Sequence, residues 1–106
     1  MTDSFSVVAF AGSLRQDSYN RALLRVARDD APEALAITLF DLIDLPLYNA
    51  DVEAEGDPPP VAEFKAAVDA ADGVLIATPE YNHGVPAVTK NAIDWASRPP
   101  RNPPIR

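Results

Sequence analysis

The chain has 106 residues, a formal net charge of −7 and no cysteine. This length suits one modest domain, and a hydrophobic content of 47% is enough to form a buried core. The acidic balance argues against a nucleic-acid-binding protein, and the lack of cysteine excludes disulfides, thiolate catalysis and zinc sites built on sulfur.

Neither the start of the chain nor its apolar runs indicate export or membrane insertion. Residues 1–4 lack the basic start and the long apolar stretch of a signal peptide. No apolar run approaches the ~20 residues that cross a bilayer. We therefore expect a cytoplasmic protein that binds neither membranes nor nucleic acid. A single histidine, His83, cannot build a histidine-rich metal site by itself, so we predict no metal.

The first predicted unit is a strand followed by a helix. The apolar run 7–11 is typical of a strand buried on both faces, and Gly12 allows a tight turn at its end. A helical pattern follows, with Ser18 or Asp17 as its N-cap and Pro32 beyond its end. We expect Tyr19, Leu23, Val26 and Ala27 on its buried face and Arg21, Arg25 and Arg28 on its solvated face.

The second predicted unit is again a strand and a helix. The strand is predicted at 36–40, and an acidic loop over 41–56 follows it. Asp57 and Pro58 supply an N-cap and a first-turn proline for the helix, and Gly73 is placed to close it. Its expected buried stripe is Val61, Phe64, Val68 and Ala71. We interpret the acidic residues 51–57 as a solvated loop.

The third predicted unit completes an α/β order. A buried strand is predicted at 74–77, and Pro86 starts a helix with Val88, Ala92 and Trp95 on one face. We interpret Trp95 as a core or subunit-interface aromatic, and Lys90 and Asp94 as an ion pair on that helix. Alternation of strands and helices predicts a parallel sheet, and the proline-rich residues after Arg98 fit neither a helix nor a central strand.

The loop after the first strand has the composition of an anion site. Ser13 and Ser18 offer hydroxyls, Arg15 a forked cation and Asn20 an amide, all near the amino end of a helix. The backbone N–H groups and the helix dipole there favour an anion, and these side chains suit a phosphate monoester. The alternative is a hydroxyl-rich helix cap with one surface arginine.

The loop after the third strand is polar as well, and it leaves the same edge of the predicted sheet. Its residues 78–86 combine a carboxylate, an aromatic ring and an amide, from Glu80, Tyr81 and Asn82. A planar heterocycle needs a flat wall and a few hydrogen bonds to its edges, which such a loop could supply. The alternative is a rigid turn with Tyr81 packed on the edge of the sheet.

Both loops resemble one family. The strand followed by Gly12-Ser13-Leu14-Arg15-x-x-Ser18-x-Asn20 resembles the phosphate loop of the NADPH-dependent FMN reductase family. This family includes azoreductase-like, quinone-reductase-like and chromate-reductase-like flavoproteins. Its second signature is similar to Pro79-Glu80-Tyr81-Asn82-x-Gly84-x-Pro86 followed by residues 90–95, and residues 45–49 resemble its loop after the second strand. The resemblance covers nearly all of residues 5–100.

The resemblance implies a fold and a set of cofactor-binding residues. The fold is a flavodoxin-like, doubly wound parallel sheet, here a single FMN-binding domain over residues 1–106 with only the first three β-α units of the family's five-stranded domain. The FMN phosphate would be held by Ser13, Arg15, Ser18 and Asn20. The ribityl chain and the isoalloxazine ring would be lined by Pro79, Glu80, Tyr81 and Asn82, with Gly84 permitting close approach.

The resemblance also implies an activity, that of an FMN-dependent NAD(P)H oxidoreductase. Its acceptor would be a small molecule such as FMN, a quinone, an azo dye or a metal oxyanion, and its assembly a homo-oligomer. Hydride transfer from nicotinamide to flavin N5 needs no side-chain acid or base, so we name no catalytic residue and read His83 as a loop residue. The alternatives are a flavin-binding electron carrier and a truncated, inactive flavodoxin-like domain.

Overall fold

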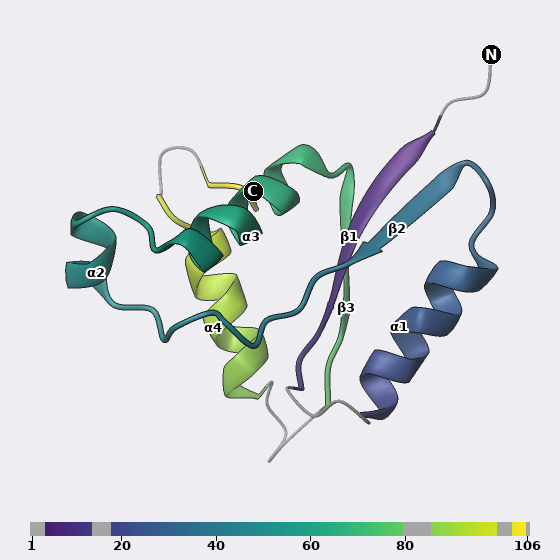
Figure 1. Ribbon diagram of the computed structural model, residues 1–106, viewed down its shortest axis with the longest axis horizontal. Coiled ribbons are helices and arrows are strands. Elements are labelled where there is room, and N and C mark those ends of the chain that lie inside the picture. The colour runs from purple at the N-terminus through teal and green to yellow at the C-terminus, as the bar shows by residue number, and fades with distance from the viewer. Residues whose placement is uncertain (1–3, 14–17, 80–85, 100–102, 106) are drawn as a thin grey trace.

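The computed structural model describes residues 4–13, 18–79, 86–99 and 103–105. The elements within them are β1 (Phe5–Ala11), α1 (Tyr19–Asp30), β2 (Leu35–Leu39), α2 (Ala50–Ala54), α3 (Pro59–Ala70), β3 (Gly73–Ala77) and α4 (Ala87–Ala96). Figure 1 shows α1 on one side of the strands and α3 and α4 on the other. The predicted α/β architecture is therefore confirmed.

The three strands form one parallel sheet in the order β2-β1-β3. β1 lies in the middle, where Ala9 is level with Leu39 of β2 and Ala11 is level with Ala77 of β3. The ladder continues past the end of β1, because Gly12 N–H donates to the Ala77 carbonyl at 2.8 Å. The loops after β1 and β3 therefore begin side by side, as the sequence predicts.

β1 divides the core into two layers because its side chains point alternately to the two faces of the sheet. Val8 and Phe10 pack with Phe64 of α3, and the two phenyl rings meet edge to face with centroids 5.4 Å apart. On the other face, Ala9 and Ala11 pack against α1. The prediction that this strand is buried on both faces is confirmed.

The predicted buried face of α1 is wrong. Leu24 enters the core at 3% exposure, whereas Tyr19 is 93% exposed, Leu23 is 60% exposed and Val26 is 55% exposed. α1 packs on β1 and β2 through Leu24, which also contacts the core side chains of β2. Because successive helical residues lie about 100° apart, the stripe through Leu23 turns away from these strands.

The helix predicted after the acidic loop is α3, and its two ends differ from the prediction. Asp57 does not cap α3; Pro58 holds the N-cap position and makes no side-chain cap bond, while the Asp57 carboxylate pairs with Lys65 at 2.8 Å. Gly73 does not close the helix either, because it is already the first residue of β3. The predicted buried stripe is confirmed at Val61, Phe64 and Val68.

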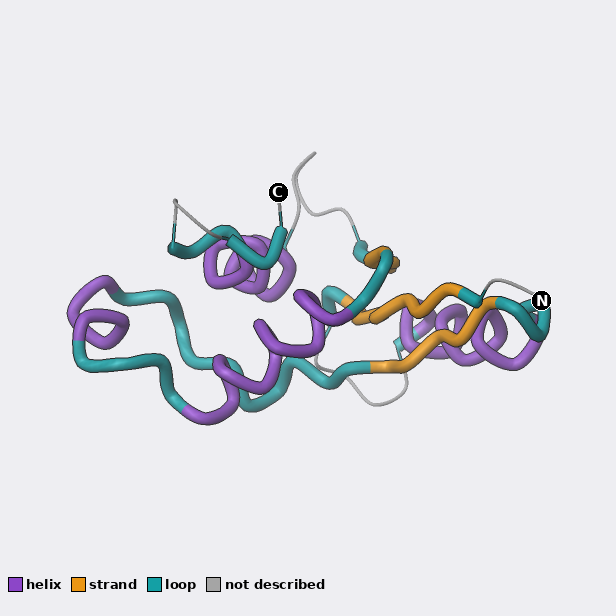
Figure 2. The backbone as a smooth tube through the Cα atoms, turned by 90° about the horizontal axis from the view of Figure 1, so that it is seen from above, coloured by secondary structure: helices purple, strands orange, loops and turns teal. Residues whose placement is uncertain are grey.

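The acidic loop after β2 is also more ordered than the sequence indicates. It contains the short helix α2, which begins after Asn49, whose side chain accepts a hydrogen bond from Asp51 N–H at 2.8 Å. Figures 1 and 2 show this loop and α2 extending away from the sheet. Residues 51–54 are helical, so the interpretation of 51–57 as a solvated loop is wrong for them, whereas Glu55 and Gly56 lie outside the helix and are exposed.

Candidate functional site

The predicted cofactor-binding residues that the structure describes lie at the carboxyl edge of the sheet. Figure 1 shows β1 and β3 ending, and α1 and α4 beginning, at the same end of the molecule, at the bottom of the view. Ser13, Ser18, Asn20 and Pro79 are half-buried at this end. The other predicted cofactor-binding residues, Arg15, Glu80, Tyr81, Asn82 and Gly84, lie outside the described residues, as does His83.

Gly12 lies where the two loops approach each other most closely. A Cβ atom at this position would overlap Thr89 Oγ1 and lie 2.5 Å from Thr78 Oγ1. These two hydroxyls share a hydrogen bond of 2.7 Å, and Thr89 is 1% exposed on α4. Gly12 therefore serves close packing of β1 against the end of β3 and the start of α4. The sequence predicts a tight turn there and does not reveal either threonine.

The start of α1 presents hydrogen-bond donors that an anion could use. Ser18 caps the helix, as predicted, because its hydroxyl oxygen accepts a hydrogen bond from Arg21 N–H at 3.1 Å. An accepting hydroxyl still has its own O–H to donate, and the first N–H groups of a helix have no intrahelical partner. No acidic residue occupies the first turn of α1. This donor set fits the phosphate of FMN.

The contacts of Arg21, next to the predicted phosphate-binding residues, were not expected from the sequence. Arg21 was expected on a solvated face, but its side chain is 14% exposed and lies between two loops. Its Nε donates to the Ser13 carbonyl at 3.2 Å, and its Nη2 donates to the Asp41 carboxylate at 3.1 Å. Asp41 lies 20 positions away in the sequence, so no local pattern indicates this contact.

The loop after β2 is fastened to α4 by two side chains one helical turn apart. Asn91 accepts a hydrogen bond from Tyr48 N–H at 2.7 Å and donates one to the Pro46 carbonyl at 2.8 Å. Trp95 donates a second one to the same carbonyl at 2.8 Å, and its ring meets Tyr48 edge to face. Trp95 was interpreted as a core or subunit-interface aromatic, and the core interpretation is confirmed, since it is fully buried.

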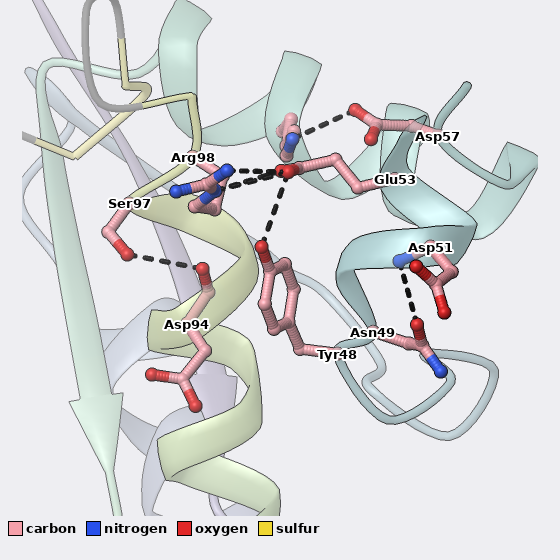
Figure 3. Close-up of polar contacts among 9 residues, drawn as sticks. Tyr48, Asn49, Asp51, Glu53, Asp57, Asp94, Ser97 and Arg98 are labelled. Carbon is pink, nitrogen blue, oxygen red and sulfur yellow. Dashed lines mark hydrogen bonds and ion pairs between the residues drawn. The ribbon is translucent and has the colours of Figure 1, made fainter. Parts of the chain in front are cut away.

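A polar cluster holds α2 against the end of α4 (Figure 3). Arg98 donates to both carboxylate oxygens of Glu53, at distances down to 2.7 Å, and Tyr48 donates to the same carboxylate at 3.2 Å. The hydrogen bonds from Arg98 lower the pKa of Glu53, and burial raises the pKa of Tyr48. The contribution of Glu53 to stability is therefore complete at neutral pH and is lost as the pH falls through its folded-state pKa.

The predicted pair of Lys90 and Asp94 on α4 is also confirmed.

The described residues contain neither a membrane-spanning helix nor a cluster of metal ligands. In the parts of the chain that the structure covers, no helix is both long and apolar enough to pass through a bilayer. The same residues contain no group of three or more histidine or acidic side chains that could hold a metal ion.

Known proteins resemble this chain in sequence and in fold. The model of the family described as NADPH-dependent FMN reductase matches residues 5–106. The chain belongs to the NADPH-dependent FMN reductase family. Its flavodoxin-like fold is shown by the flavoenzyme NAD(P)H:(acceptor) oxidoreductase FerB from Paracoccus denitrificans, which superimposes with a TM-score of 0.86 at 41% identity over 94% of this chain and 54% of that one.

Two curated relatives illustrate how this reductase-family chain compares in length. It is 50% identical over 103 residues to an NAD(P)H-dependent FMN reductase from Pseudomonas aeruginosa. The aligned region covers 97% of this chain and 56% of the relative. It is 44% identical over 105 residues to a quinone reductase from Escherichia coli K12, with the same two coverages, 97% and 56%. The chain thus spans about half the length of these relatives.

Proposed function

We propose that the protein is an FMN-dependent NAD(P)H oxidoreductase that reduces a small-molecule acceptor. The observation that supports this proposal is the set of hydrogen-bond donors at the start of α1, where Ser18 caps the helix at the carboxyl edge of a parallel sheet. Ligands of open α/β sheets bind at this edge. Relatives named as FMN and quinone reductases at 44–50% identity support the same activity.

Each loop has its own part in holding the cofactor. Ser13, Arg15, Ser18 and Asn20 bind the FMN phosphate, and Pro79, Glu80, Tyr81, Asn82 and Gly84 line the ribityl chain and the isoalloxazine ring. The FMN held there would supply the hydride-transfer chemistry that joins NAD(P)H to the acceptor. The protein residues bind and orient the two partners, and none of them has to move a proton as a general acid or base.

The activity is tested by measuring flavin and NADPH turnover on the same purified protein. We expect a visible absorbance spectrum of bound FMN and steady oxidation of NADPH when a quinone is added. An electron carrier would bind FMN without this steady turnover. A colourless protein that gains no flavin on incubation with FMN would contradict the proposal.

His83 provides the internal control for this mechanism. The His83→Gln variant should turn over at nearly the rate of the unchanged protein, because no side-chain acid is required. A loss of about 100-fold or more, which is typical of a missing general acid, would contradict the assignment of hydride transfer to cofactor positioning alone.

We further propose a cytoplasmic homo-oligomer, and that this 106-residue chain taken by itself is stable only with another chain against the edge strand β3. Within the described sheet β3 pairs only with β1, and Val74 and Leu75 are 38% and 37% exposed. An exposed apolar edge favours association. Sedimentation at micromolar concentration should show an associated species, with Leu75→Lys shifting the chain toward monomer. A cooperatively folded, flavin-bound monomer would contradict this proposal.

A further inference from the structure

Arg21 connects the phosphate loop to a part of the chain that has no predicted cofactor contact. The residue lies in the first turn of α1, and its guanidinium reaches back to the Ser13 carbonyl with Nε, at 3.2 Å. Its Nη2 reaches Asp41, the second residue after β2, at 3.1 Å. One planar group therefore joins the loop after β1 to the loop after β2.

Asp41 is itself fixed in position. The same carboxylate oxygen that receives Arg21 also accepts a hydrogen bond from Ile43 N–H at 3.0 Å. The preceding residue, Phe40, continues the sheet through its N–H, which donates to the Ala9 carbonyl at 2.8 Å. Asp41 is thus anchored to the sheet on one side and to its own turn on the other.

The contacts of Arg21 indicate positioning more than stability. The side chain of Asp41 is 46% exposed, and an ion pair with a partner this exposed adds little to stability. A guanidinium holds its donors in a rigid fork, so bonds from Nε and Nη2 to two different partners fix the spacing between those partners. Here the fixed partners are the main chain of Ser13 and the anchored Asp41.

We propose that Arg21, braced by Asp41, is a positioning residue for the FMN phosphate. It holds the main chain at Ser13, the first residue of the proposed phosphate site, in place before the cofactor binds. This inference rests on the proposed function, because it assigns Arg21 and Asp41 to the phosphate site of that function. Neither residue has to touch the cofactor.

The direction in which two substitutions change FMN affinity distinguishes a positioning role from a simple charge effect. Arg21→Lys keeps the positive charge, but a single ammonium cannot reproduce the fork. Asp41→Asn removes a negative charge near an anion site, which by electrostatics alone would tighten FMN binding. Positioning predicts weaker FMN binding in both variants, because both weaken the brace. The matched control is Arg28→Met, which removes a positive charge from the last turn of α1, where Arg28 pairs only with its exposed neighbour Asp29 among the contacts described.

The experiment is a titration of FMN and of riboflavin, which lacks the phosphate, against the unchanged protein and the three variants. Loss of one or two hydrogen bonds in the brace should weaken FMN about 3- to 10-fold and riboflavin less than about 2-fold. Arg28→Met should leave both affinities within about 2-fold. Thermal unfolding of each variant confirms that it is folded at the titration temperature.

Three results would overturn the inference, and they can be told apart. If Asp41→Asn binds FMN as tightly as the unchanged protein or more tightly, and Arg21→Lys binds FMN with unchanged affinity, the positioning role is wrong. The proposed function would not be affected by that result. Equal losses of affinity for FMN and riboflavin would show that the contact between Arg21 and Asp41 only supports the structure and does not position the phosphate site. If the unchanged protein itself fails to prefer FMN over riboflavin, the proposed function fails, and this inference fails with it.

Discussion

Replacing Gly12 with alanine should destabilise the fold by about 1–3 kcal/mol, the usual cost of forcing extra volume into a packed core. The new Cβ would overlap the hydroxyl of Thr89 and crowd that of Thr78. The two hydroxyls are bonded to each other, and Thr89 is buried, so neither can move without losing that bond. Because Gly12 also begins the phosphate loop, FMN binding should weaken as well.

Gly73 supplies a matched control for this prediction. A Cβ atom there would meet only Val7 Cγ2, at an ordinary contact distance of 3.8 Å. Chemical denaturation should therefore show Gly73→Ala unchanged or slightly more stable, since alanine restricts the unfolded chain more than glycine does. Adding Thr89→Ala to Gly12→Ala should restore part of the lost stability. Equal stability of Gly12→Ala and Gly73→Ala would contradict the packing role of Gly12.

The strands were the most predictable part of the fold. A continuous apolar run is a local signal, and the runs at 7–11, 36–40 and 74–77 all mark observed strands to within two residues. The buried face of α1 was less predictable, because the helix has more apolar residues than it buries against β1 and β2. Leu23 and Leu24 are adjacent and equally apolar, and only tertiary packing decides that Leu24 is the buried one.

In the site, too, local features could be predicted from the sequence and contacts between distant residues could not. The cap by Ser18 follows from its place before a helix and is confirmed. The contact of Arg21 with Asp41, and that of Thr78 with Thr89, join residues 20 and 11 positions apart on different elements. Side-chain type and spacing contain no signal for such pairs, because the fold alone brings them together.

The second family signature has a structural role that its sequence does not reveal. Asn91 and Trp95 resemble the signature that follows the flavin loop, and both fasten the loop after β2 by bonding the Pro46 carbonyl. Arg21 and Asp41 fasten the start of that same loop to Ser13 in the loop after β1. The loop after β2 thus links the elements that follow β1 and β3, although it contains no predicted cofactor ligand.

The central claim, that the loop between β1 and α1 holds the FMN phosphate, is tested most directly at Arg15. A charge-assisted hydrogen bond is worth about 1.5–3 kcal/mol, so Arg15→Ala should weaken FMN binding roughly 10- to 100-fold and leave riboflavin nearly unaffected. Arg28→Ala removes the same charge from the far end of α1 and serves as the control. Titration of both flavins against these variants gives the answer: a loss specific to FMN in Arg15→Ala is the predicted result, and equal losses for FMN and riboflavin would contradict the phosphate site.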